Sequence, residues 1–436
     1  MIRLANVLVV SAGRPEPDDL CDSLIRAGYG VASAATDGAL RRAASERPDV
    51  VLIADSGDGL PFVALGKAFK DDGATADIPV VLAAGTVGPE LCAAALDAGL
   101  DDVIAIGCAE VELLARIRPL GRLSTMLAEL RQRARTAAAF GVSARGQVAL
   151  GGIGGRPRVL VAGDDPDAAS MPTEEADLVV AANLFEAEDM LTRRGFDAAI
   201  LSARRPGEAE FAFCTQVRHN PALFNLPIVL IAGSDQPPSE AYRHGATRLL
   251  TRADHPAIVR AAVLTLVRRQ KLRWSIREAL GDSLAGAAKD PGTQCYSAAF
   301  LDAYLAERVA TAAASGRHLA VLCFHAANVD AVGRQFGADA ASLLTGQIGR
   351  WIAGLVRAED LVARTRDHEF CVALPDTPLA EAETVMHRIA GVLAYTDFAV
   401  PEVYQPVKTW VQVGAAAARE GDDAGTVTDR ARRNMG

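Results

Sequence analysis

The chain has 436 residues, of which 50% are hydrophobic and 23% are charged, as expected for a globular protein of about three domains. Its 45 basic and 54 acidic residues give a net charge of −9, and without a basic excess to neutralise phosphates we expect no nucleic-acid binding. The apolar runs are far shorter than a membrane span, and the first residues lack a secretory signal pattern. Seven scattered cysteines without metal-site spacing indicate core thiols in a cytoplasmic protein.

The first part of the chain contains an internal repeat. NVLVV at 6–10 corresponds to RVLVA at 158–162, and DIPVVLAAG at 77–85 corresponds to NLPIVLIAG at 225–233. Short aliphatic runs of this kind are typical of strands buried on both faces of a parallel sheet, and stretches with helical periodicity lie between them. The repeat therefore predicts two doubly wound α/β domains, in which sites lie at the carboxyl ends of the strands.

Composition shifts divide the chain further. A glycine-rich stretch follows the first repeat, and a connecting helix follows the second. The remainder mixes helices with strands, including one tight hairpin, which predicts an α+β domain. The predicted boundaries are a first α/β domain at 1–140, a linker at 141–157, a second α/β domain at 158–275, a connecting helix at 276–289 and an α+β domain at 290–436.

Both repeats resemble response-regulator receiver domains, which have a flavodoxin-like fold. The resemblance implies an acidic pair for Mg²⁺, a phosphoacceptor Asp, and Thr or Ser and Lys for the phosphoryl group, because phosphoryl transfer needs neutralisation of several oxygens. Asp55 lies one residue after the acceptor position, where a bulge could bring it into place. Its role is open between two alternatives, a phosphoacceptor and a solvated carboxylate at the end of a strand. The other positions of this first site carry Ser11 and Ala12 for the acidic pair, Ala54 for the acceptor, Ala84 for Thr and Ile106 for Lys.

The second repeat departs from the receiver pattern at the same places. Ser202 stands at the acceptor position, Ala232 at the Thr position and Arg252 at the Lys position. Asp164 and Asp165 remain near the end of the first strand. We therefore expect this domain to be a structural or dimerisation module.

The last domain resembles the GGDEF family of diguanylate cyclases. DPGTQCYSAAF at 290–300 is similar to the motif that begins the family's domain, and LAVLCFHAANVDAVGRQFGADAA at 319–341 is similar to its metal-binding strand and substrate helix. RDHEF at 366–370 stands where the GGDEF motif is expected. The order of the three domains resembles the receiver–receiver–GGDEF class of this family.

The resemblance also implies a degenerate catalytic site. Forming cyclic di-GMP from GTP needs carboxylates that hold two metal ions, and a glycine pair that lets phosphate approach the backbone. His325, His368 and Glu369 lack a recognisable metal-site spacing, so we expect no metal, no cofactor and no catalytic residue. The substituted positions are His325 and Ala327 on the metal strand, Gly333 and Ser342 in the guanine pocket, Arg366 and Asp367 for the glycines, and His368 before Glu369. The chain end ARRNMG is expected to lack the family's last helix and its lysine.

A second family site is retained. Many members bind their product at an RxxD motif that ends five residues before GGDEF, and here Arg357 and Asp360 are followed by LVART and then RDHEF. Arg388 matches the arginine that the family places on the next helix. The alternative interpretation is an ion pair between residues three apart at a helix end. The chemistry suits cyclic di-GMP, because Arg can bind guanine O6 and N7 together and a carboxylate can accept from N1 and N2.

The sequence thus predicts a noncatalytic cyclic di-GMP receptor that acts as a scaffold. By resemblance to a noncatalytic effector of this class, we expect recruitment to a cell pole, homodimerisation, and protein partners in proteolysis, namely the ClpXP protease and an adaptor such as RcdA. Two alternatives stay open: a response regulator controlled by phosphorylation at Asp55, and a residual GTP-binding or diguanylate cyclase enzyme.

Overall fold

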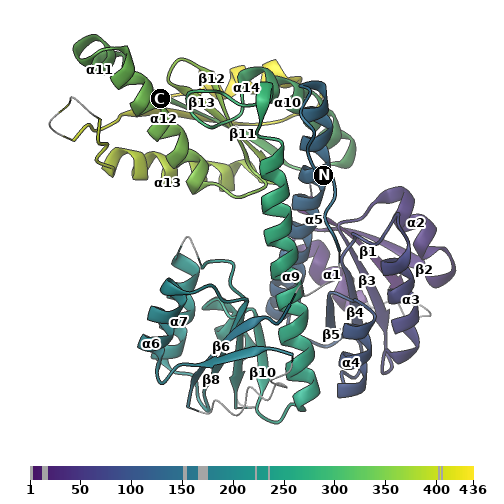
Figure 1. Cartoon of the computed structure of the whole chain (residues 1–436). Helices are drawn as coiled ribbons and strands as arrows, with labels where there is room; N and C mark the ends of the chain where they lie inside the picture. Colours follow the sequence, from purple (N-terminus) through teal and green to yellow (C-terminus); the bar gives the residue numbers. More distant parts are fainter. Residues whose placement is uncertain are drawn as a thin grey trace. The chain divides into compact units, whose positions relative to one another are not determined.

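The computed structural model describes residues 3–11, 18–150, 155–164, 175–220, 223–233, 236–400, 403 and 406–436 (Figure 1). They separate into two compact units. The first unit, which we call the paired-sheet unit, comprises Ala5–Ser124 and Ala149–Ser275. The second, the antiparallel unit, comprises Met1–Leu4, Thr125–Val148 and Ile276–Gly436. In the described part of the chain no helix is long and apolar enough to cross a membrane.

The first sheet of the paired-sheet unit has five parallel strands in the order β2-β1-β3-β4-β5. Aliphatic runs form its central strands, whose side chains are buried because helices cover both faces. Its strands are β1 (Asn6–Ser11), β2 (Gly30–Ala35), β3 (Val50–Asp55), β4 (Val80–Ala84) and β5 (Asp102–Ala105). Its helices are α1 (Asp18–Arg26), α2 (Ala39–Glu46), α3 (Leu60–Asp71), α4 (Pro89–Asp97) and α5 (Glu110–Ala139).

The second sheet repeats this topology, with the order β10-β9-β8-β6-β7 and parallel pairing throughout. Its strands are β6 (Arg158–Gly163), β7 (Asp177–Val180), β8 (Ala198–Ser202), β9 (Ile228–Ala232) and β10 (Arg248–Thr251). Its helices are α6 (Leu184–Arg193), α7 (Glu208–His219), α8 (Pro238–Arg243) and α9 (Pro256–Asp282). The prediction of two doubly wound α/β folds is confirmed.

The antiparallel unit contains a four-stranded sheet in the order β12-β13-β11-β14. Its strands are β11 (Leu319–Ala326), β12 (Leu361–Arg366), β13 (Glu369–Pro375) and β14 (Val411–Ala417). Its helices are α10 (Ala298–Ser315), α11 (Val329–Phe336), α12 (Ala338–Leu355), α13 (Leu379–Tyr395) and α14 (Ala424–Arg433). The α+β prediction for this part of the chain is confirmed.

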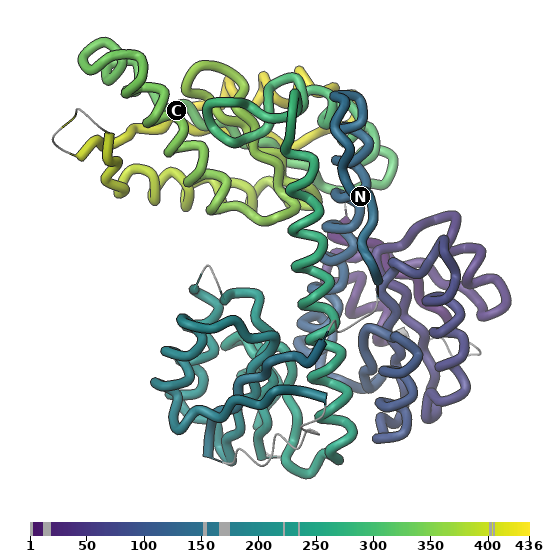
Figure 2. Tube along the Cα trace, in the orientation of Figure 1, coloured from purple at the N-terminus to yellow at the C-terminus, as the bar shows by residue number. Residues whose placement is uncertain are grey.

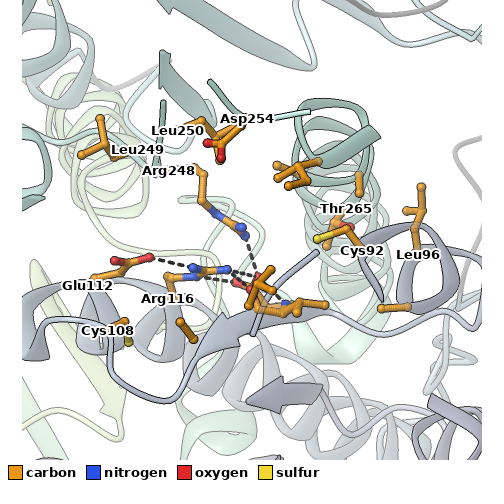
Figure 3. A pocket seen from close by; sticks show the side chains of 18 of the residues that line it. Cys92, Leu96, Cys108, Glu112, Arg116, Arg248, Leu249, Leu250, Asp254 and Thr265 are labelled. Carbon is orange, nitrogen blue, oxygen red and sulfur yellow. Dashed lines mark hydrogen bonds and ion pairs between the residues drawn. The ribbon is translucent and has the colours of Figure 1, made fainter. Parts of the chain in front are cut away.

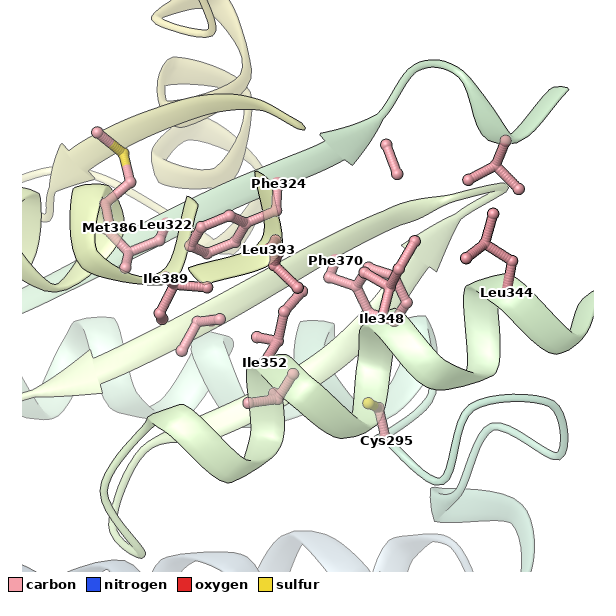
Figure 4. Close-up of a cluster of buried hydrophobic side chains, with 14 of the residues drawn as sticks. Cys295, Leu322, Phe324, Leu344, Ile348, Ile352, Phe370, Met386, Ile389 and Leu393 are labelled. Atoms are coloured by element: carbon pink, nitrogen blue, oxygen red, sulfur yellow. The ribbon is translucent and has the colours of Figure 1, made fainter. Parts of the chain in front are cut away.

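Both faces of the antiparallel sheet are buried, as the alternation along β11 shows. Leu322 and Phe324 point into a core shared with α12 and α13 (Figure 4). The Cα trace shows these two helices along one face of the sheet (Figure 2). Val321 and Cys323, at the intervening positions, point into a second core formed with α10 and α14. The second core also takes residues from the C-terminal half of α5, so that half of the helix packs with the antiparallel sheet.

Two findings refine the sequence analysis. The boundary between the compact units falls within α5, near Thr125, and the predicted limits 1–140 and 141–157 for the first domain and linker stay a prediction. The expectation that the chain end lacks a helix is wrong, because α14 is present. The carboxylate of Asp423 accepts the backbone N–H of Thr426 at 2.7 Å and so caps the start of this helix.

Candidate ligand-binding site

The RxxD motif forms the turn between α12 and β12. Oδ2 of Asp360 accepts the backbone N–H of Arg357 at 2.8 Å, and the backbone N–H of Asp360 donates to the carbonyl of Arg357 at 3.1 Å. The side chain of Arg357 is exposed, whereas Asp360 is only 6% exposed. The two motif residues therefore differ in role: Asp360 closes the turn from inside, and Arg357 presents its guanidinium to solvent.

Arg388 comes from the middle of α13 and lies beside the same turn. Its Nη2 donates to the carbonyl of Leu355 at 2.9 Å, and Leu355 is the last residue of α12, two positions before Arg357. Arg388 is exposed. The structure thus brings the three residues predicted for the ligand site to one place at the C-terminal end of α12.

The chemistry of this place follows from its donors. A guanidinium offers several N–H groups in a fixed plane and can form paired hydrogen bonds to a nucleobase edge or a phosphate. Arg357 and Arg388 each supply one such group near this turn, and the turn also contains the carboxylate of Asp360, which accepts hydrogen bonds. The combination suits a ligand that carries both negative charge and donor-acceptor edges.

The hairpin between β12 and β13 carries the residues that stand in place of the GGDEF motif. Arg366 ends β12, Asp367 and His368 form the turn, and His368 has a left-handed backbone with φ of 57°. Nδ1 of His368 lies 2.8 Å from the Thr345 hydroxyl, and its Nε2 lies 3.2 Å from Oδ1 of Asp330. His368 is therefore held by two of the helices that border the hairpin.

Glu369 begins β13 and is 4% exposed. Its Oε1 accepts from the Thr365 hydroxyl at 2.6 Å and lies 3.0 Å from Nε of Arg432, which α14 supplies. Burial works against the charge of Arg432, yet the bond to Glu369 raises its pKa. His325 is the partner of Glu369 in the register between β11 and β13. The Glu369 carboxylate, which could have bound a metal ion, is instead paired with the guanidinium of Arg432.

The remaining degenerate positions lie around this hairpin. Gly333 is on α11, where an added Cβ would come within 3.2 Å of Ala341, and Ser342 is exposed on α12. Ala327 directly follows β11 and donates its backbone N–H to Trp410 at 3.2 Å. Sequence reasoning missed Arg432, because it compared the chain end with the family's pattern and expected no helix there.

In the second repeat, the side chains at the receiver-site positions form hydrogen bonds with one another. Nη2 of Arg252 donates to Oδ1 of Asp164 at 2.7 Å and to the hydroxyl of Ser202 at 3.2 Å. Gly163 approaches Ser202 so closely that a Cβ there would lie 1.9 Å from the Ser202 carbonyl oxygen. Arg252 thus bonds the side chains at two other receiver-site positions, Asp164 and Ser202. Asp165 lies outside the described residues.

In the first repeat, Asp55 is the last residue of β3 and pairs in register with Ala84. Its Oδ2 accepts the backbone N–H of Gly59 at 2.9 Å, just before α3 begins. Ala54 is buried at 4% exposure. Of the other positions, Ile106 donates its backbone N–H to Ala84, Ser11 ends β1, and Ala12 lies outside the described residues.

A charge cluster that the sequence analysis did not identify joins the two repeats within the paired-sheet unit. Asp102 of β5 lies 2.6 Å from Arg116 of α5 and 2.6 Å from Arg248 of β10, and Arg269 of α9 lies 3.8 Å away. A cavity of about 290 Å³ adjoins the cluster, and Figure 3 shows the guanidinium groups of Arg116 and Arg248 converging in it. The available signal was the repeat itself, since Asp102 and Arg248 occupy equivalent positions in it.

Comparisons with known proteins relate the last part of the chain to one family and the whole chain to one response regulator. Residues 287–436 match the family model described as diguanylate cyclase, GGDEF domain. The response regulator PleD from Caulobacter vibrioides is 28% identical over 422 residues, which cover 94% of this chain and 92% of that protein.

Solved structures match the last third of the chain. The GGDEF domain of DgcB from Caulobacter crescentus, in complex with c-di-GMP, is 16% identical over 34% of this chain and 88% of that one, with a TM-score of 0.33. The FimX GGDEF domain from Pseudomonas aeruginosa is 19% identical over 34% of this chain and 91% of that one, with a TM-score of 0.33. Residues 287–436 thus match a GGDEF domain, and the chain as a whole resembles the response regulator PleD.

Proposed function

We propose that this protein is a noncatalytic receptor for cyclic di-GMP and that it binds this ligand at the turn of Arg357 and Asp360, together with Arg388. The observation that carries the proposal is that the exposed Arg388 bonds the end of α12, directly beside the turn that holds the exposed Arg357 and the nearly buried Asp360. The GGDEF family match makes a guanine dinucleotide the ligand of choice.

The ligand's chemistry fits each of the three groups. Arg357 can bind O6 and N7 of one guanine with paired hydrogen bonds, and Arg388 can meet a phosphate or a second guanine edge. The Asp360 carboxylate can accept from guanine N1–H and N2–H₂, since a carboxylate has about four lone-pair positions and can accept bonds in addition to the one from the Arg357 backbone. Calorimetric titration with cyclic di-GMP, GTP and cyclic di-AMP tests this choice. Saturable binding of cyclic di-GMP alone is expected, and preference for either other nucleotide would contradict it.

The hairpin supports the noncatalytic part of the proposal. Two-metal chemistry needs several carboxylates that are free to bind cations. Here the Glu369 carboxylate is bonded to Arg432 and Thr365, and His325 stands beside it in register. An ion-paired and nearly buried carboxylate is a poor metal ligand, because the guanidinium already neutralises it.

We therefore predict that the purified full-length chain forms no cyclic di-GMP from GTP and Mg²⁺. Chromatographic separation of nucleotides after prolonged incubation measures this directly, with an active GGDEF enzyme as the positive control. Product that forms with the wild type and disappears with Glu369→Gln would contradict the prediction and favour a residual enzyme.

We also predict that Asp55→Asn leaves cyclic di-GMP affinity within about twofold of the wild type. The Asp55 carboxylate bonds the backbone ahead of α3, and an asparagine oxygen can keep that bond. Asp58→Asn, which changes an exposed carboxylate in the same loop, is the matched control. Incubation with acetyl phosphate followed by Phos-tag electrophoresis is the second readout. Labelling of the wild type that only Asp55→Asn abolishes would instead support a phosphorylation-controlled response regulator.

We further propose that the protein acts as a scaffold in the cytoplasm, with its three domains at 1–140, 158–275 and 290–436. The resemblance to PopA, a noncatalytic effector of the PleD class, suggests ligand-dependent recruitment to a cell pole. It also suggests homodimerisation and delivery of cell-cycle regulators to ClpXP through an adaptor such as RcdA. Co-purification of tagged wild type and Arg357→Gly, with and without cyclic di-GMP, tests whether partner capture follows ligand occupancy.

A further inference from the structure

The turn of Arg357 and Asp360 is supported from behind by the C-terminal half of α5. Arg133 on this helix is 3% exposed, and its Nη1 donates to the carbonyl of Ala358 at 3.3 Å, while its Nη2 donates to the carbonyl of Glu359. Ala358 and Glu359 are the two middle residues of the RxxD turn. One planar guanidinium thus holds both of the turn's central carbonyls.

Arg133 is itself fixed in place. Its guanidinium lies 5.8 Å from the centre of the Tyr296 ring and 3.8 Å from the Glu129 carboxylate. The backbone of Tyr296 in turn bonds the strand that follows the turn, donating to Val362 at 2.9 Å and accepting from Arg364 at 2.9 Å. Arg133 and Tyr296 therefore restrain the turn and the start of β12 together.

The helix that carries Arg133 is seated by a buried polar network. Oε1 of Glu129 lies 3.1 Å from Nε of Arg308, and its Oε2 accepts from the Tyr304 hydroxyl at 2.7 Å. One turn earlier, the Thr125 hydroxyl donates to Asp376 at 2.7 Å. Glu129 and Tyr304 are fully buried, so buried hydrogen bonds as well as apolar packing fix the position of this half of α5.

We propose that Arg133 is a positioning residue for the cyclic di-GMP site. Arg133 holds the Arg357–Asp360 turn in its binding conformation, and ligand affinity therefore depends on how the C-terminal half of α5 packs. The inference rests on the proposed function and adds a mode of regulation to it. Because coupling between sites is reciprocal, a ligand that needs the restrained turn also stabilises α5 in its seat. The same helix begins at Glu110 in the first α/β domain, so that domain and the ligand turn share one element.

The test compares Arg133→Met with Tyr304→Phe in the full-length chain. Both variants remove contacts of the α5 network, but only Arg133 touches the turn. Calorimetry should show cyclic di-GMP affinity reduced about tenfold or more in Arg133→Met, since two charge-assisted bonds to the turn are lost, and within about twofold in Tyr304→Phe. Arg133→Lys keeps the charge and should restore part of the affinity. Thermal melting of each variant reports the loss of stability separately.

The outcomes separate the inference from the proposed function. Wild-type affinity in Arg133→Met, or an equal loss in both variants, overturns the positioning role, while loss of binding in Arg357→Gly would still support the ligand site. If the wild type does not bind cyclic di-GMP, the proposed function fails. Hydrogen exchange of the Asp360 amide in the ligand-free chain then tests Arg133 alone. Faster exchange in Arg133→Met than in Tyr304→Phe supports the role, and equal rates contradict it.

Discussion

Arg357→Gly is expected to abolish cyclic di-GMP binding while the chain stays folded. Charge-assisted hydrogen bonds contribute about 1.5–3 kcal/mol each, so loss of a two-point contact should weaken binding by at least ten- to a hundredfold. The side chain is exposed, and the turn is closed by the backbone of residue 357 and by Asp360, which glycine leaves in place. Calorimetric titration and a thermal melt of the same preparation measure both effects.

A matched series makes this result specific. Arg350→Ala removes another exposed arginine, on α12, and should leave affinity unchanged. Arg388→Ala should weaken binding less than Arg357→Gly, because its guanidinium supplies only part of the ligand contacts and also bonds the end of α12. Near-wild-type affinity in Arg357→Gly with an intact melt would move the ligand site elsewhere.

The contact of Asp360 with the ligand is better tested by asparagine than by alanine. If Asp360 and Arg357 formed only an exposed ion pair, Asp360→Ala would cost about 0–1 kcal/mol of stability. The structure instead places a nearly buried carboxylate on the backbone N–H of Arg357, so alanine would also unseat the turn. Asp360→Asn keeps an acceptor oxygen and is the better probe of the contact with guanine.

The sequence predicted the folds well because their signals are local. Aliphatic runs between helical stretches repeat twice, and a further apolar run marks β11, so the fold class of all three sheets could be expected. The RxxD turn could be found from its spacing before the hairpin. Helix α14 was missed although Asp423 and Thr426 carry an ordinary capping signal, because the family's pattern served as the reference.

Buried charges could not be predicted, since they depend on which helix face meets a distant strand. Arg133 and Arg135 lie in the same charged stretch of α5, yet the Arg133 side chain is 4% exposed and that of Arg135 is 62% exposed. Nothing local distinguishes them. The same holds for Arg432, whose partner Glu369 is 63 residues away in the chain. Such pairs follow from tertiary packing, which local sequence patterns do not reveal.

Asp102→Ala is expected to cause the largest loss of stability among the substitutions considered. The Asp102 carboxylate is surrounded by Arg116, Arg248 and Arg269, whose side chains are 7%, 9% and 6% exposed. Removing one partner from a buried ionic cluster costs about 3–5 kcal/mol, because the remaining charges stay buried without compensation. Glu110→Gln is the control, since its ion pair with Arg26 is exposed and should contribute only about 0–1 kcal/mol.

The pH dependence gives a second, independent reading of the same cluster. Burial alone would raise the pKa of Asp102, but Arg116 and Arg248 outweigh it and hold the pKa below its ordinary value of 3.8. The unfolded chain therefore binds this proton more readily, so the stabilisation is fully present above pH 3.8 and is lost as pH falls below it. Calorimetric melts of Asp102→Asn should accordingly lose less stability between pH 5 and pH 3 than those of the wild type, an interval of about two units around the ordinary pKa. Parallel losses in both proteins, or a melt of Asp102→Ala as high as that of Glu110→Gln, would mean that the cluster does not hold the two repeats together.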